Sequence, residues 1–163
     1  MSIKRVVEEI RGFTYEYYLD ENNWKQGVLR KYKEGKLIES LEYKDDMLDG
    51  ISSIYENEIV ISKSSYKKNQ LDGEKTTYYS NGLIKTEAHY LCGKLDGESR
   101  SYSINGQRLV VENYKNGKLD GEKRRYYENG KLEMIGNYRE NNMVGSWKWY
   151  DIEGNIVRER EID

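Results

Sequence analysis

The chain has 163 residues, of which 36% are apolar and 34% are charged, so it is poor in the apolar material that a globule with a deep core needs. Its 27 basic and 29 acidic residues are spread along the whole chain, and no domain-wide field points to nucleic acid or to an anionic membrane. Sixteen tyrosines against one phenylalanine favour a thin architecture, because a tyrosine ring can be buried on one side while its hydroxyl stays wet.

The N-terminal sequence carries acidic residues where a secretory signal would need an apolar stretch, and no run of about 18 apolar residues occurs. A single cysteine, Cys92, cannot form an internal disulfide and fits a reducing compartment. The absence of proline and the abundance of lysine, asparagine and isoleucine resemble the output of an AT-rich bacterial genome. We therefore expect a cytoplasmic bacterial protein.

Residues 1–23 form the first predicted element, an N-terminal cap or a degenerate hairpin. A hairpin is suggested by a glycine and three tyrosines, at Gly12, Tyr15, Tyr17 and Tyr18. A short helix is suggested by apolar residues at helical spacing, at Ile3, Val6, Val7 and Ile10. Either element would provide the atypical end that a repeat array needs.

From residue 24 to 163, the sequence repeats itself every 23 or 24 residues in about six copies. Each copy has a glycine, at Gly27, Gly50, Gly73, Gly97, Gly121 and Gly145. A tyrosine follows each glycine, at Tyr32, Tyr55, Tyr78, Tyr102, Tyr126 and Tyr150. A second tyrosine precedes every glycine but the first, at Tyr43, Tyr66, Tyr90, Tyr114 and Tyr138. The period leaves no room for an ordinary helix, so we expect two strands per copy.

Both ends of each predicted hairpin carry turn residues. One turn places a residue that tolerates positive φ three positions after the second tyrosine, at Asp46, Asn69, Gly93, Gly117 and Asn141. The other turn carries the tight-hairpin dipeptide Asn-Gly, at Asn81-Gly82, Asn105-Gly106 and Asn129-Gly130. The first two copies are one residue short, and the second lacks Asn-Gly, so the sheet is expected to be irregular there.

These patterns predict an all-β fold, an elongated single-sheet antiparallel meander of hairpins in which no unit buries its apolar face alone. The recurring glycines are expected to let a neighbouring tyrosine ring lie over the strand. In the last copy, Trp147 and Trp149 enlarge the apolar surface. That end is expected either to cap the array or to pair with a second chain, as in a homodimer.

The segment from Tyr114 to Leu132 closely resembles the MORN repeat, in the bacterial variant form found in YwqK-like antitoxin proteins. It has a Tyr-Lys-Asn-Gly-Lys start, a Leu-Asp-Gly-Glu centre and a Tyr-Tyr-Glu-Asn-Gly end, and the resemblance covers roughly residues 24–163. It implies a curved sheet of hairpins that serves as a scaffold for protein partners and, in some eukaryotic members, for membrane phospholipids. It implies no catalytic residues, and for the bacterial form it implies an antitoxin or immunity-type role.

No residue is favoured as a catalytic group or a metal ligand, and we expect no cofactor. His89 occupies a column that is polar in the other copies, which indicates a solvent-facing strand position, and Cys92 occupies a turn. Acidic residues recur before the glycines, at Asp49, Asp72, Asp96 and Asp120. Since an enzyme needs one differentiated pair of carboxylates, this repetition favours aspartates that each close a turn through their own side chain.

Two sets of surface residues are candidates for binding. Arg100, Arg124 and Lys148 occupy equivalent positions and form a basic stripe, which would bind phosphate groups unless neighbouring glutamates balance it. Tyr79, Tyr127, Trp147 and Trp149 are predicted to be exposed aromatic anchors for a partner. Function is expected where the copies differ, at these aromatic residues and at the irregular N-terminal end.

The sequence thus favours a non-catalytic protein-binding scaffold, with an antitoxin or immunity-type role toward another bacterial protein such as a toxin or effector encoded nearby. The alternative is a peripheral membrane or phosphoinositide-binding module. Nucleic acid is disfavoured as a partner because the charges are balanced.

Overall fold

The computed structural model describes residues 2–163, which form strands and turns without a helix. The chain divides into two compact units, the first ending at Gly82 and the second beginning at Leu83. The strands of the first unit are β1 (Lys4–Ile10), β2 (Phe13–Leu19), β3 (Gly27–Lys33), β4 (Lys36–Lys44), β5 (Met47–Glu56), β6 (Ile59–Lys67) and β7 (Gln70–Tyr78). Those of the second are β8 (Ile84–Leu91), β9 (Lys94–Tyr102), β10 (Arg108–Lys115), β11 (Lys118–Leu119), β12 (Gly121–Tyr126), β13 (Leu132–Arg139), β14 (Asn142–Tyr150) and β15 (Ile156–Ile162).

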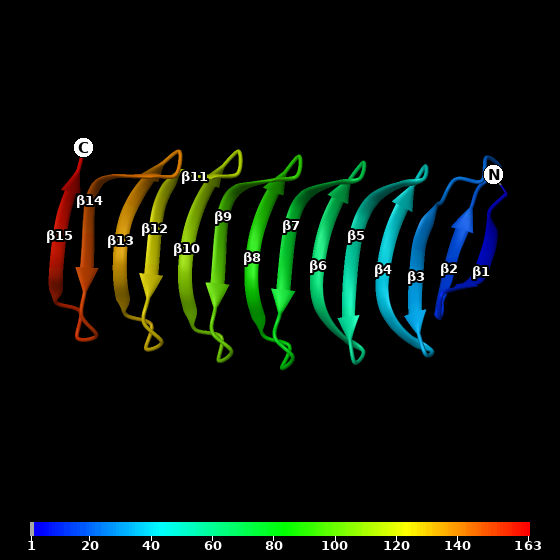
Figure 1. Ribbon diagram of the computed structural model, residues 1–163, viewed down its shortest axis with the longest axis horizontal. Helices are drawn as coiled ribbons and strands as arrows, with labels where there is room; N and C mark the ends of the chain where they lie inside the picture. Colours follow the sequence, from blue (N-terminus) through cyan, green and yellow to red (C-terminus); the bar gives the residue numbers. More distant parts are fainter. Residues whose placement is uncertain (1) are drawn as a thin grey trace. The chain divides into compact units, whose positions relative to one another are not determined.

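Within each unit the strands pair in the order of the chain, and each pair is antiparallel (Figure 1). The two-residue strand β11 pairs with β10 beside β12. Each 23- or 24-residue copy therefore supplies two neighbouring strands. This arrangement confirms the predicted all-β antiparallel meander of hairpins.

The N-terminal residues form a hairpin, β1–β2, joined by the two-residue turn Arg11-Gly12 with φ of 53° and 82°. The apolar residues near the N-terminus are at helical spacing, but they do not form a helix. A helix of seven residues would be marginal on its own, because nucleation costs more than so short a helix regains. Pairing with β2 instead bonds every second residue of β1 along its whole length.

The turns that link one copy to the next are the tight turns predicted from the sequence. Both residues of each turn have positive φ, between 48° and 82°, in Asp45-Asp46, Lys68-Asn69, Cys92-Gly93, Asn116-Gly117 and Glu140-Asn141. Two successive residues with positive φ define the two-residue turn whose twist matches that of the flanking strands. The turn chemistry was therefore sufficient to locate this end of the hairpins.

The Asn-Gly dipeptides form a different turn from the two-residue turn that was predicted. In the second unit, the loop after each repeat tyrosine is closed by an N–H of its first residue, as from Ser103 to the Gln107 carbonyl at 2.8 Å and from Tyr127 to the Lys131 carbonyl at 2.9 Å. Gly106 has φ of 81°, whereas Asn105 has no positive φ. The loop therefore holds one residue more, with only its glycine in the left-handed region.

This extra residue accounts for the two repeat lengths. In the first unit, Glu34-Gly35 joins β3 to β4 and Asn57-Glu58 joins β5 to β6 as two-residue turns, with positive φ at every position. These copies are the ones that are one residue short. The expected irregularity is thus confined to the turn, and β3 to β6 run as continuous strands.

The core is thin, and Trp147 is its most buried large side chain, at 1% exposed. The Trp147 ring lies over Gly136 on β13, where a Cβ would come within 2.1 Å of the Trp147 Cδ2. Tyr138 meets the ring edge-on at 5.1 Å between centroids, and Nε1 donates to the Val144 carbonyl at 3.2 Å. An aromatic ring therefore does cover a strand glycine, but the ring belongs to a tryptophan.

Four of the recurring glycines, Gly50, Gly73, Gly97 and Gly121, are covered by polar side chains and not by the tyrosine rings that were expected. A Cβ on Gly121, which has φ of 118°, would lie 2.9 Å from the Asn113 Cβ. Glu42, Ser65 and His89 stand over the equivalent glycines of other copies. The register shift beside each glycine brings this polar column over the backbone, which is why the tyrosines are displaced from it.

The tyrosines of the described residues are half-buried, as the composition indicated, and several of their hydroxyls donate to a carboxylate. The Tyr114 hydroxyl donates to Glu112 at 2.9 Å, and the Tyr102 hydroxyl donates to Glu87 at 2.7 Å. Burial raises the pKa of Tyr114 to about 12. These residues thus supply apolar area to a sheet that has little other core.

Candidate functional site

The chemically versatile residues have structural partners. His89 is exposed and its Nδ1 donates to the Asp96 carbonyl at 2.9 Å, in the same way that Asn113 Nδ2 donates to the Glu122 carbonyl at 2.8 Å. Cys92 is exposed in a tight turn with φ of 48°. Within residues 2–163, no three histidine, cysteine, aspartate or glutamate residues lie where they could hold a metal ion.

Three of the recurring aspartates close a turn through their own side chains, as was predicted, and each of these turns belongs to the following copy. Asp96 Oδ2 accepts from the Asn116 N–H at 3.0 Å, and Asp120 Oδ2 accepts from the Glu140 N–H at 3.2 Å. Asp49 Oδ2 accepts from the Lys68 N–H at 3.2 Å in the first unit. The carboxylates are therefore occupied as links between copies.

A second set of bonds joins the same turns to the preceding copy. The Asn69 N–H donates to the Leu48 carbonyl at 2.8 Å, and the Leu48 N–H donates to Asn69 Oδ1 at 2.7 Å. Asn141 makes the same pair of bonds with Leu119, at 2.9 and 2.8 Å. At Gly117 only the backbone bond to the Leu95 carbonyl is present, at 2.7 Å, because glycine has no side chain.

Exchanging these turn residues tests how much the side-chain bond contributes. Asn141→Gly keeps a residue that accepts positive φ but removes the bond to Leu119, and we expect it to lower the free energy of unfolding by about 0.5–1.5 kcal/mol. Gly117→Asn is the reverse exchange, and we expect it to raise the free energy of unfolding by up to about 1 kcal/mol. Urea denaturation measures both. Equal stability of the two variants and the parent would show that the backbone bond alone holds the turn.

The predicted basic stripe is neutralised by glutamates on the same face. Arg100 is ion-paired with Glu98, whose side-chain hydrogen bond raises the pKa of Arg100. Arg124 Nη2 lies 2.5 Å from Glu122 Oε1, and Lys148 Nζ lies 3.2 Å from Glu159 Oε1. Every cation of the stripe therefore has a carboxylate beside it, which weakens its attraction for phosphate groups.

The predicted aromatic anchors do not form one exposed surface. The expected exposure of Trp147 is wrong, because the absence of a side chain at Gly136 lets its ring sink into the sheet. Trp149 is half-buried, with the Arg158 guanidinium 4.9 Å from its ring centroid. Tyr79 and Tyr127 lie just beyond β7 and β12, and the Tyr127 hydroxyl donates to the Tyr150 carbonyl at 2.7 Å.

Trp24, which was expected in the opening hairpin but was not among the predicted binding residues, is 48% exposed in the loop between β2 and β3. That loop is held by Asp20, which is 6% exposed and whose Oδ1 accepts from the N–H groups of Asn22 at 2.8 Å and Trp24 at 3.0 Å. The bond from Trp24, followed by those from Asn22 and Gln26, lowers the pKa of Asp20. The loop is therefore fixed by an ionised carboxylate.

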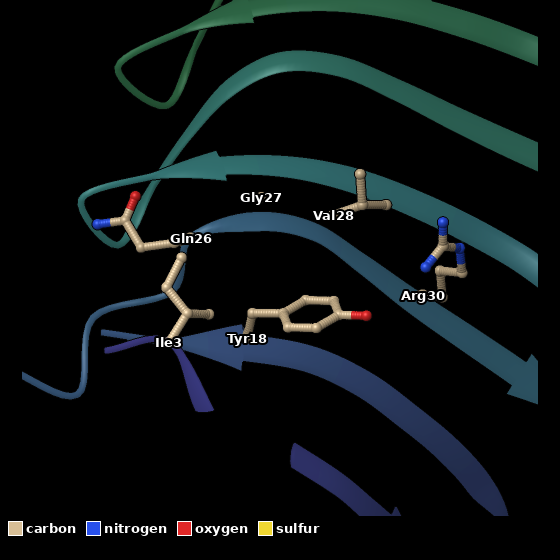
Figure 2. Close-up of a pocket in the computed structure, with 6 residues that line it drawn as sticks. All are labelled: Ile3, Tyr18, Gln26, Gly27, Val28 and Arg30. Carbon is tan, nitrogen blue, oxygen red and sulfur yellow. The ribbon is translucent and has the colours of Figure 1, made fainter. Parts of the chain in front are cut away.

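A mostly apolar hollow of about 400 Å³ lies beside this loop in the first unit. It is lined by Ile3, Tyr18, Gln26, Gly27, Val28 and Arg30. Figure 2 shows the Tyr18 ring and Val28 along the hollow, with the Tyr18 hydroxyl directed toward Arg30 and with Ile3 and Gln26 at the opposite end. The hollow lies at the irregular N-terminal end, where the sequence led us to expect function.

Two of the lining residues have contrasting surroundings. Gln26 is already engaged, since its Nε2 donates to Asp45 Oδ1 at 2.8 Å and to Asp20 Oδ2 at 3.1 Å. Arg30 lies across the strands from Glu16, whose two oxygens accept from Arg5 Nε at 2.8 Å and from the Tyr32 hydroxyl at 3.3 Å. Arg30 therefore lines the hollow opposite a glutamate that Arg5 and Tyr32 already engage through hydrogen bonds.

A second hollow of about 330 Å³ lies in the second unit and is made by equivalent residues of successive copies. It is lined by Tyr102, Gly106, Gln107, Arg108, Tyr126 and Gly130. Two tyrosines of the repeat column and a glycine from each of two loops thus form its walls. Other pairs of 24-residue copies supply the same tyrosines and glycines, so these walls belong to the scaffold, whereas Gln107 and Arg108 are replaced by Lys131 and Leu132 in the next copy.

Two segments of the chain, residues 71–91 and 119–140, match the MORN repeat variant family. MORN repeats are consistent with a protein- or membrane-binding repeat module. No curated protein matches the chain. The described residues contain no helix long and apolar enough to cross a membrane.

Similarity to solved structures is low. A mutant of S. aureus TarM, in complex with Fondaparinux, alpha-GlcNAc-glycerol and UDP, is 16% identical with a TM-score of 0.37 over 71% of this chain. A second TarM structure is 16% identical with a TM-score of 0.36 over 69% of this chain. The present chain spans about a fifth, 21%, of the TarM chain in both.

Proposed function

We propose that this chain is a non-catalytic protein-binding scaffold, and that its partner docks on the hollow between β2 and β3. The observation that carries the proposal is the combination of an apolar lining, from Ile3, Tyr18 and Val28, with the Arg30 guanidinium at the rim. The repeats hold this surface in place. We further propose an antitoxin or immunity-type role, in which the partner is a toxin or effector encoded nearby.

The chemistry of the hollow defines what it would accept. Its volume of about 400 Å³ suits one or two side chains of a partner. Apolar walls favour an aliphatic or aromatic side chain, and Arg30 favours a carboxylate next to it, because a guanidinium can bind a carboxylate through two N–H groups. The partner therefore presents an apolar residue beside an aspartate or glutamate.

A membrane surface is the less favoured partner. Arg100, Arg124 and Lys148 each lie beside a glutamate, so the stripe offers anionic lipid little net positive charge. Binding to anionic vesicles in a flotation assay, lost when these three residues are changed together, would establish the phosphoinositide alternative and overturn the protein-scaffold proposal.

Capture from the native cell tests the proposal. Tagged wild-type chain is expected to recover one specific protein, and the products of neighbouring genes are the first to compare. Arg30→Glu reverses the charge at the rim and is expected to reduce recovery at least about tenfold, because it brings a carboxylate against the partner's carboxylate and like charges across an interface repel. Lys115→Glu, at an exposed position of β10 in the second unit, makes the same charge change and should leave recovery intact.

Two outcomes would contradict the proposal. Equal recovery by the wild type and Arg30→Glu would remove the hollow from the interface. Equal loss in Arg30→Glu and Lys115→Glu would show that net charge, and not this site, governs binding. Circular dichroism of both variants verifies that the sheet is retained.

A further inference from the structure

The first strand of the chain pairs on one side only. Among the described residues, β1 forms a ladder with β2 and with no other strand. Such an edge presents unpaired backbone groups to any strand of suitable sequence. The side chains on β1 are largely exposed, Val7 at 53% and Ile10 at 45%.

The turn after β1 determines which residues face outward. It is a two-residue turn with positive φ at both positions, so Ile10 and Phe13 form the hydrogen-bonded pair that closes the hairpin. Every second residue counted back from Ile10 then bonds toward β2. Arg5, Val7 and Glu9 are left with outward-facing backbone groups, and their side chains share one face of the sheet.

The outward-facing residues of one copy of β1 are complementary in charge to those of a second copy. If two copies of β1 run antiparallel about a two-fold axis at Val7, that valine faces its own copy and Arg5 faces Glu9 of the second copy on both sides of the axis. Opposite charges directly across a strand pair stabilise it, and like charges destabilise it. Arg5 uses its Nε for Glu16 at 2.8 Å and also interacts with Tyr18, and its five N–H groups are enough to reach a second carboxylate as well.

The last strand has the opposite property. Arg158 and Arg160 lie on one face of β15, and Glu159 and Glu161 lie on the other. Pairing of β15 with its own copy about Glu159 would place Glu159 opposite Glu159 and Arg158 opposite Arg160. Both contacts bring like charges together, which is how natural edges are protected from association.

We propose that two copies of this chain form a dimer through β1, with the two strands antiparallel about a two-fold axis at Val7. The contact is the same patch on both copies, so it closes on itself and stops at two chains. This contact lies at the N-terminal edge, and not at the tryptophans of the last copy, where the sequence favoured pairing with a second chain. It does not depend on the partner proposed for the hollow.

Sedimentation equilibrium of the purified full chain tests the dimer without any other protein. The wild type is expected to sediment with twice the mass of the chain as its concentration rises. Val7→Lys places two like charges at the axis and is expected to abolish the dimer, while the new ammonium lies opposite Glu16 within its own chain. Val157→Lys, at the 63% exposed valine of β15, is the matched control and should leave the dimer intact.

Charge exchange supplies the sharper test. Glu9→Arg places two arginines across each end of the contact and is expected to weaken the dimer. Adding Arg5→Glu to it restores opposite charges across the axis and should restore the dimer. A wild type that stays monomeric throughout, loss of the dimer in Val157→Lys, or species that grow beyond two chains would each overturn the proposal, the last by indicating head-to-tail pairing of β1 with β15.

Discussion

Trp147→Ala is expected to lower the free energy of unfolding by about 3–5 kcal/mol, the largest effect of any single substitution proposed for this chain. The ring is 1% exposed. Because the core is thin, few neighbouring side chains can move into the cavity that the substitution leaves. Its contacts with Gly136 and Tyr138 on β13 also join the last hairpin to the one before. Urea denaturation followed by circular dichroism measures the loss.

A tryptophan elsewhere in the chain provides the control. Trp24 is 48% exposed, and we expect Trp24→Ala to change the free energy of unfolding by no more than about 0.5 kcal/mol. The two variants delete the same side chain and differ mainly in burial. Similar losses from both would mean that Trp147 is not the packing centre of the second unit.

Gly136→Ala examines the same contact from the opposite side. Gly136 has no positive φ, so the cost of an added Cβ comes from the clash with the Trp147 ring, and we expect about 1–3 kcal/mol. In a Trp147→Ala background this clash is absent, and the same substitution should cost much less. A double-mutant cycle with additive effects would contradict the close approach of ring and glycine.

Tyr102→Ala is expected to lower the free energy of unfolding by about 2–4 kcal/mol, because a half-buried ring of the repeat column is removed from a sheet with little other core. Tyr102→Phe keeps the ring and removes only the hydroxyl that donates to Glu87 at 2.7 Å, and it should cost about 0.5–1.5 kcal/mol. The same urea titrations measure both. An alanine variant as stable as the phenylalanine variant would show that the hydroxyl, and not the ring, is what the column contributes.

Local chemistry explains why the turns were predictable. A two-residue turn needs positive φ at both of its residues, and Asp46, Asn69 and Asn141 each tolerate positive φ. Because this condition concerns only two neighbouring residues, the sequence alone locates the turn. The Asn-Gly loops show the limit of the same argument. Asn105-Gly106 serves equally well in a two-residue turn or in a longer loop with glycine in the left-handed region, and the pairing of the flanking strands decides between them.

Features that depend on neighbouring copies could not be predicted in this way. The bond that Asp96 accepts from the Asn116 N–H spans 20 positions, and nothing in the sequence beside the aspartate indicates which turn it closes. Trp147 was expected to be exposed because its burial depends on a single glycine in the adjacent strand. The hollow at Tyr18, Val28 and Arg30 required the register between β2 and β3, which only the paired strands define.

The links between copies run in one direction along the chain. Asp120 and Leu119 hold the turn at Glu140-Asn141, just as Asp96 and Leu95 hold the turn at Asn116-Gly117. Each copy thus carries a turn that the preceding copy holds and a Leu-Asp pair that holds the turn of the following copy. A duplicated or deleted 24-residue segment would place the same Leu-Asp pair beside the same kind of turn at its boundary. Duplication could therefore lengthen the protein, and deletion could shorten it, with these bonds between copies kept.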